Sequence, residues 1–146
     1  MKTNSLLQKA KQHCESHRYR WTEPRQQVLR ALAKQRRPVG AYDIIKLLSS
    51  DQKTVNAPTV YRAIEFWQEQ GFVHRIDSSN TFITCSNHHC NGNFFILICQ
   101  ACSAVTEIAA KNITQLVNRC SQQAKFAVSK INLEVHGLCQ QCKENN

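Results

Sequence analysis

The sequence predicts an α+β protein in two parts. Helices fill the first part and a β-hairpin closes it, whereas the second part combines a few strands with one helix. Two observations lead to this prediction. Apolar residues of the first part recur every three or four positions, and this period changes near residue 72. In the second part, two C-x-x-C pairs flank the strand-like and helix-like segments.

The net charge of +9 is unevenly distributed along the chain. Residues 1–80 contain fourteen Lys and Arg against seven Asp and Glu, whereas residues 81–146 contain five against three. A basic region suggests a polyanionic partner such as nucleic acid, although solvated surface lysines would give the same count. All of the eight cysteines except Cys14 lie in the second part, so a basic half precedes a metal-rich half.

We expect neither a secretory leader nor a membrane span in this chain. Met1–Lys11 is polar, and the longest apolar run, Phe94–Cys99, has the length of a strand. We therefore expect a cytoplasmic protein that does not associate with a membrane. Thiols stay reduced in the cytoplasm, where clustered cysteines usually bind metal.

Four helices are expected in the first part. Thr22 is a suitable N-cap for the second, with Pro24 in its first turn. Pro58 lies in the first turn of the fourth, and Gly71 is a suitable residue to end it. The expected helices cover Ser5–His17, the segment from Thr22 to before Pro38, Ala41–Leu48, and the segment from Asn56 to Gln70.

The fourth helix has a clear apolar stripe. Val60, Ala63, Ile64 and Trp67 follow the i, i+3, i+4, i+7 spacing of a buried helix face. This stripe leaves the polar and aromatic side chains between its members closer to the outward side; these are Thr59, Tyr61, Arg62 and Glu65.

Two strand-like runs, Phe72–Asp77 and Thr81–Cys85, surround the turn signal Ser78–Asn80. Helices followed by a hairpin are the outline of a winged helix-turn-helix, in which the hairpin is the wing. The helix just before the wing is then the recognition helix that enters the major groove. The sequence therefore predicts double-stranded DNA as a partner.

The polar residues 86–93 are expected to form a hinge loop between domains at 1–85 and 94–146. The second domain should be a small sheet whose apolar surface a second copy completes, which gives a homodimer. Cys120 lies on the apolar face of its helix and is expected in the core. The expected elements are strands at Phe94–Ile98, Ala104–Ile108 and Phe126–Val135, with a helix at Asn112–Ala124.

The two C-x-x-C pairs predict a zinc site formed by Cys99, Cys102, Cys139 and Cys142. Four thiolates from two tight turns suit tetrahedral zinc, and a site with four protein ligands is closed and structural. Two disulfides or four buried thiols are the alternatives. A second group on the first helix, His13, Cys14 and His17, is a weaker metal candidate because helical His and Cys often have no ligand role.

The protein could instead be an enzyme or a constitutive nucleic-acid binder. No H-E-x-x-H motif occurs, and two C-x-x-C pairs that fill one site leave no open position for catalysis. A thiol redox protein would use one C-x-x-C rather than two distant ones. A nucleic-acid binder with only structural zinc would keep its DNA affinity under mild chelation, so chelation distinguishes it from a sensor.

Several motifs together resemble the ferric uptake regulator family over almost the whole chain, from about Leu6 to Cys142. The resemblance implies a dimeric, metal-activated repressor and not an enzyme, with a winged-helix DNA-binding domain before an α/β dimerisation domain. Because Cys85 ends the wing, the chain is most similar to the zinc-sensing members of the family, which repress metal-uptake genes. The motifs are Thr22, Arg25, Ala41–Asp43, Pro58–Arg62, Gly71–His74 and His136–Cys139.

The resemblance also implies two zinc ions per subunit. The four cysteines match the structural site of the family, and His74, Cys85 and Glu107 match ligands of a sensing site between the domains. The fourth sensing ligand should be a His before the first C-x-x-C, where this chain has Gly92. His89 is the first choice to replace it, followed by His88 and Cys90.

The ligand types by themselves also favour zinc. A thiolate combined with imidazoles prefers zinc to magnesium, calcium or manganese. For DNA contact, the resemblance and the position of the fourth helix together indicate Tyr42, Thr59, Tyr61 and Arg62.

Overall fold

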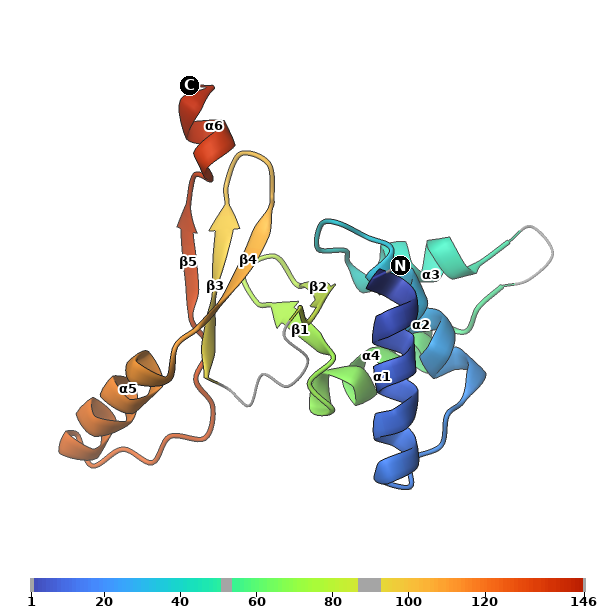
Figure 1. Ribbon diagram of the computed structural model, residues 1–146, viewed down its shortest axis with the longest axis horizontal. Coiled ribbons are helices and arrows are strands. Elements are labelled where there is room, and N and C mark those ends of the chain that lie inside the picture. Colours follow the sequence, from blue (N-terminus) through green and yellow to red (C-terminus); the bar gives the residue numbers. More distant parts are fainter. Residues whose placement is uncertain (1, 51–53, 87–92, 146) are drawn as a thin grey trace. The chain divides into compact units, whose positions relative to one another are not determined.

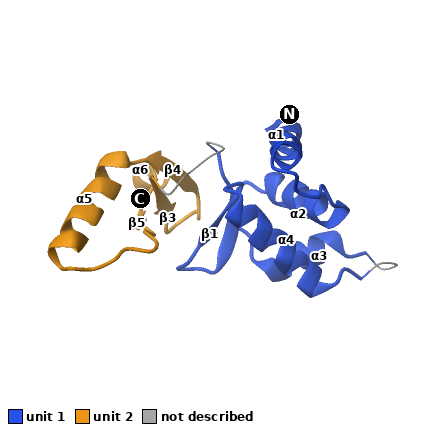
Figure 2. Cartoon of the chain, turned by 90° about the horizontal axis from the view of Figure 1, so that it is seen from below, with its two compact units in different colours: residues 1–88 blue, residues 89–146 orange. Residues whose placement is uncertain are grey.

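The computed structural model describes residues 2–50, 54–86 and 93–145. The chain divides into two compact units, residues 1–88 and 89–146, which are coloured separately in Figure 2. Most of the expected hinge, residues 87–92, lies outside the described residues. Within the described ranges, no helix is both long and apolar enough to cross a membrane.

The first unit consists of four helices and a hairpin, as the sequence predicts (Figure 1). Thr22 precedes the second helix, and its carbonyl accepts the Gln26 N–H at 3.1 Å. Gly71 follows the fourth helix with φ +78°, a left-handed conformation that glycine adopts without strain. The elements are α1 (Lys2–Ser16), α2 (Glu23–Ala33), α3 (Ala41–Leu48), α4 (Ala57–Glu69), β1 (Val73–Ile76) and β2 (Thr81–Thr84).

The core of this unit forms where α2 packs against α1, α3 and α4. The predicted α4 stripe is buried, and Trp67 is fully enclosed. The Trp67 Nε1–H donates to the Arg25 carbonyl at 2.8 Å, and its ring meets Trp21 edge-on at 6.0 Å between centroids. Burying each large apolar side chain contributes about 1.5–3 kcal/mol, so the stripe fixes α4 and leaves its opposite face outward.

The hairpin is attached to the helical core rather than projecting from it. Strands β1 and β2 pair antiparallel, from Val73 opposite Thr84 to Ile76 opposite Thr81. Val39, between α2 and α3, bridges to Phe82, and its N–H donates to the Phe82 carbonyl at 2.9 Å. The positions of side chains on the hairpin are therefore set by the helices beneath it.

The second unit is built on a three-stranded sheet of order β4-β3-β5. The central strand β3 runs antiparallel to β4 and parallel to β5, so both edges of the cysteine-bearing strand are paired (Figure 1). The elements are β3 (Phe94–Cys99), β4 (Val105–Ala109), α5 (Lys111–Gln123), β5 (Glu134–Gly137) and α6 (Gln140–Glu144).

The prediction of a long strand at Phe126–Val135 is wrong for most of its length. The strand β5 begins only at Glu134, where pairing with Ile96 of β3 starts. Residues 126–133 form no strand among the described residues, although the Leu133 carbonyl accepts the Ile96 N–H at 3.1 Å, and Phe126 is 67% exposed. An alternating pattern makes a strand only where a partner strand accepts its hydrogen bonds.

The prediction that Cys120 lies in the core is also wrong for the single chain. Cys120 is exposed, and α5 has no buried residue at all. Leu116 on the same helix is 53% exposed, because nothing in the described part of the chain covers this apolar stripe. The helical period was correctly identified, but the surface that would bury it is missing from one copy.

Candidate metal centres and nucleic-acid interface

The four-cysteine group lies at one end of the second unit's sheet. Cys99 ends β3, and Cys102 lies in the turn that leads to β4. Cys139 immediately precedes α6, which contains Cys142. The parallel register places Cys99 opposite Gly137, so the ends of β3 and β5 bring the two C-x-x-C turns together.

The sulfur positions fit tetrahedral zinc. All four Sγ atoms lie within 4.8 Å of one another, and the Sγ atoms of Cys102 and Cys139 are 3.8 Å apart. Zinc–sulfur bonds of about 2.3 Å in a tetrahedron give about 3.8 Å between sulfurs, whereas a disulfide needs about 2.05 Å. Every cysteine within the described residues is free, so the sulfur geometry favours the metal over the disulfide alternative for this group.

The backbone around the group favours thiolates. The Cys139 N–H donates to the Cys99 Sγ at 3.3 Å, and this bond is the main reason that the pKa of Cys99 falls to about 6. In contrast, the side chains of Cys139, Cys102 and Cys99 raise the pKa of Cys142 to about 12. The Cys142 thiol therefore needs a neighbouring positive charge to ionise at neutral pH, and a divalent cation between the four sulfurs would supply it.

A second set of ligand atoms lies on the hairpin of the first unit. His74 is on β1, and Cys85 follows β2 with its N–H donating to the Phe72 carbonyl at 2.8 Å. The hairpin register thereby places a ring nitrogen of His74 within 4.8 Å of the Cys85 Sγ. Both side chains are buried, at 8% and 2% exposure. A buried imidazole and thiol at this separation can bind the same zinc ion.

The other predicted sensing ligands belong to the second unit or lie outside the described residues. Glu107 is in the middle of β4, opposite Ile96, and its side chain is half-buried. His89, and with it His88 and Cys90, falls outside the described residues. One unit alone therefore supplies two of the predicted sensing ligands, His74 and Cys85.

The weaker candidate group on α1 has structural contacts instead. A His13 ring nitrogen bonds the Gln70 side chain at 2.9 Å, and the His17 Nδ1 bonds the His13 carbonyl at 2.9 Å. Cys14 is completely buried, and that burial raises its pKa. These contacts join α1 to the end of α4 and do not converge on a common ion.

The predicted DNA-contacting residues lie on the two helices that precede the hairpin. Tyr61 is 52% exposed and Arg62 is exposed, both near the start of α4, whereas Thr59 is half-buried. Tyr42 on α3 is 66% exposed. Because the buried stripe of α4 faces the core, Tyr61 and Arg62 are available to a partner, as the sequence predicts.

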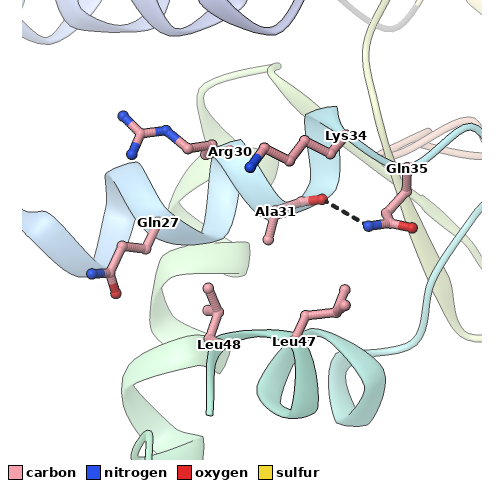
Figure 3. Close-up of a pocket in the computed structure, with 7 residues that line it drawn as sticks. All are labelled: Gln27, Arg30, Ala31, Lys34, Gln35, Leu47 and Leu48. Carbon is pink, nitrogen blue, oxygen red and sulfur yellow. Dashed lines mark hydrogen bonds between the residues drawn. The ribbon is translucent and has the colours of Figure 1, made fainter. Parts of the chain in front are cut away.

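A groove of about 420 Å³ separates α2 from α3 (Figure 3). Arg30 on α2 and Lys34 just after it project at one side, while Leu47 and Leu48 form the α3 side. The groove lining contains no carboxylate, thiol or imidazole in the described part of the chain. The groove therefore offers no group of metal ligands, whereas the hairpin of the first unit carries His74 and Cys85.

Comparison with known proteins agrees with this arrangement. The model of the ferric uptake regulator family matches residues 16–136. The zinc uptake regulation protein of Escherichia coli is 35% identical over 146 residues, which is 97% of this chain and 84% of that protein.

Solved structures give the same result. A structure of a zinc uptake regulator complexed with zinc and DNA has a TM-score of 0.93 and 34% identity, covering 99% of this chain and 97% of that one. Holo XcZur has a TM-score of 0.87 and 32% identity, covering 97% and 99%. This chain therefore belongs to the ferric uptake regulator family, which is a family of transcription regulators and not of enzymes.

Proposed function

We propose that this protein is a zinc-responsive DNA-binding repressor of metal-uptake genes that acts in the cytoplasm as a homodimer. The observation that carries the proposal is the buried His74 and Cys85 pair, placed on the hairpin directly after the helix that presents Tyr61 and Arg62. The similar proteins with zinc in their names, one of them in a complex with zinc and DNA, support the same choice of metal and partner.

Two zinc ions per subunit would have different roles. The four cysteines form a closed set within the second unit, so zinc there supplies folding free energy rather than chemistry. We assign residues 94–146 to dimerisation, residues 1–85 to DNA binding and residues 86–93 to the hinge. The first two assignments follow the ligands and exposed side chains that the segments carry, and the hinge assignment follows the polar sequence of residues 86–93.

The sensing site would use ligands from both domains. His74 and Cys85 supply nitrogen and sulfur from the hairpin, Glu107 supplies a carboxylate oxygen, and His89 is our choice for the fourth ligand. A shared ion restricts the angle between the domains that hold its ligands. Zinc binding would therefore favour the arrangement in which the two recognition helices of a dimer fit successive major grooves.

The apolar surface of the second unit suits a second copy of the chain. Leu116 on α5 and Val135 on β5 are about half exposed, and Leu97 of the central strand is also exposed. Apolar side chains gathered on one small unit indicate an interface, and an isologous twofold contact is the commonest way to bury such a surface.

Sequence recognition would rest on the start of α4. The Arg62 guanidinium can bind guanine O6 and N7 together, and Tyr61 can pack on a thymine methyl or bond a phosphate. Thr59 and Tyr42 would make short contacts to the DNA or contacts to its sugar–phosphate backbone, and these contacts would position the helix.

The zinc-loaded protein can first be used to select a tightly bound duplex from a random DNA library. The proposal is then tested on that duplex. Affinity for that duplex is then measured before and after a mild chelator, with circular dichroism as the control for folding. A sensor loses high-affinity binding while its spectrum is unchanged. Full affinity after removal of the weaker zinc would instead favour a constitutive binder.

The fourth ligand can be assigned with a matched pair of variants. His89→Ala should abolish zinc-dependent DNA binding, as Glu107→Ala should, whereas His88→Ala should leave it unchanged. The reverse result for the two histidines would assign His88 as the ligand. Normal zinc response in both variants would leave Cys90 as the candidate, which Cys90→Ser would test.

A further inference from the structure

Tyr42 and Lys46 form a pair on the outer surface of α3. We propose that they act as one DNA-contacting unit, in which Lys46 holds the Tyr42 ring in place and binds a backbone phosphate. The inference rests on the proposed DNA-binding function and adds Lys46, a residue that sequence reasoning missed. The signal was the i, i+4 spacing, which places both side chains on one helix face.

The geometry of the pair is that of a cation–π contact. The Lys46 Nζ lies 4.5 Å from the centroid of the Tyr42 ring. An ammonium within about 6 Å of an aromatic face is attracted by the electrons of the ring. Tyr42 is 66% exposed and Lys46 is also exposed, so the pair is not held by packing in the core. The contact with Lys46 therefore helps to restrict the orientation of the Tyr42 ring.

Lys46 keeps most of its charge available to another anion. Within the described residues, no ion pair links Lys46 to a carboxylate, although Asp43 lies one turn earlier on α3. An ammonium has three N–H donors, and the tyrosine ring covers only one side of it. Because Lys46 is exposed, a singly charged oxygen can reach the remaining donors without displacing the ring.

The position of α3 indicates which anion this is. In a helix-turn-helix, the helix before the recognition helix crosses the DNA backbone. The helix α3 precedes α4, and its exposed face carries Tyr42 and Lys46. Phosphate oxygens are therefore the anions expected opposite Lys46, and lysine contacts to them give affinity that depends on salt and not on sequence.

The test is a double-mutant cycle with the zinc-loaded protein and the duplex selected above. Lys46→Met keeps the apolar stem and removes the charge, and we expect about a two- to fivefold loss of affinity. The slope of log affinity against log salt should fall by about 1. Because Tyr42→Ala removes the other half of the unit, the double variant should lose less affinity than the product of the single losses.

Two further variants separate this role from a general effect of charge. Lys46→Arg should restore affinity and salt slope, because a guanidinium can also stack on the ring and bind phosphate. Lys130→Gln removes one exposed charge from the second unit and should change neither quantity.

Three results would overturn the inference while leaving the proposed function intact. The first is an unchanged affinity in Lys46→Met, and the second is losses that multiply independently in the cycle. The third is a loss of affinity in Lys46→Arg equal to that in Lys46→Met. If the unmodified protein shows no zinc-dependent DNA binding, the proposed function itself fails.

Discussion

The two metal-ligand sets differ in what their own part of the chain supplies. The four cysteines all belong to the second unit, and the pairing of β3 with β5 brings their sulfurs to zinc-like separations. The hairpin of the first unit supplies only His74 and Cys85, both buried. A complete set stabilises the unit that contains it. An incomplete set needs ligands from elsewhere, and that need allows a metal ion to couple distant parts of a molecule.

The largest effect should follow from loss of a ligand in the complete set. Cys102→Ser replaces a thiolate by a hydroxyl that binds zinc poorly at neutral pH, so the second unit should lose its zinc and unfold. Structural zinc contributes on the order of 10 kcal/mol. Elemental analysis, circular dichroism and sedimentation should show loss of zinc, of structure and of the dimer.

Cys120→Ser is the matched control, because Cys120 is an exposed cysteine on α5 of the same unit. It should keep its zinc and its fold. A Cys102→Ser protein that remains a folded dimer with full zinc content would show that the cysteine set is not structural, and the contrast between the two sets would disappear.

A ligand change in the incomplete set should affect function and not folding. Cys85→Ser should keep the four-cysteine zinc and the dimer, yet weaken zinc-dependent DNA binding by more than about 100-fold. Even a change to a residue that only hydrogen-bonds to a metal ligand lowers metal affinity or activity by about 10- to 100-fold. His74→Ala should give the same result. The double variant should be no worse than either single variant, since both ligands act through one ion.

Fluorescence anisotropy with the selected duplex over a range of free zinc measures this loss. If zinc-responsive DNA binding survives in Cys85→Ser, the hairpin thiol is not a ligand of the sensing zinc. The sensing ion would then have to be sought elsewhere, with Cys90 as the first residue to test.

A smaller effect separates DNA contact from metal binding. Arg62→Ala should retain both zinc ions and cost about 1–3 kcal/mol of DNA-binding free energy, with relaxed base preference at one position. Arg30→Ala is the control, because Arg30 is an exposed arginine that projects at the α2–α3 groove (Figure 3). Equal affinities of the two variants for the selected duplex would show that the recognition helix has been wrongly identified.

Local signals explain why much of the fold could be predicted from the sequence. Pro58, Gly71 and the stripe at Val60 and Trp67 act within one helix, so the bounds of α4 were predicted almost to the residue. The cysteine spacing similarly defines a metal site without knowledge of the fold.

The errors arose where distant partners decide the structure. The strand expected from Phe126 onward fails because β3 offers pairing only from Ile96, and no local pattern reveals that register. Cys120 is exposed because its helix stripe has no cover within the single chain. The proximity of His74 to Cys85 follows from hairpin register and was predictable. The metal-binding roles of both residues, like those of Glu107 and His89, remain predictions.

Zinc titration of the chelated dimer, with metal content and DNA affinity followed together, tests the contrast between the two ligand sets most directly. We predict that chelation leaves one zinc per subunit and a folded dimer with low affinity for the selected duplex. Adding a second zinc per subunit should restore high affinity in step with its binding. Full affinity with one zinc per subunit, or no gain on binding of the second, would contradict this account.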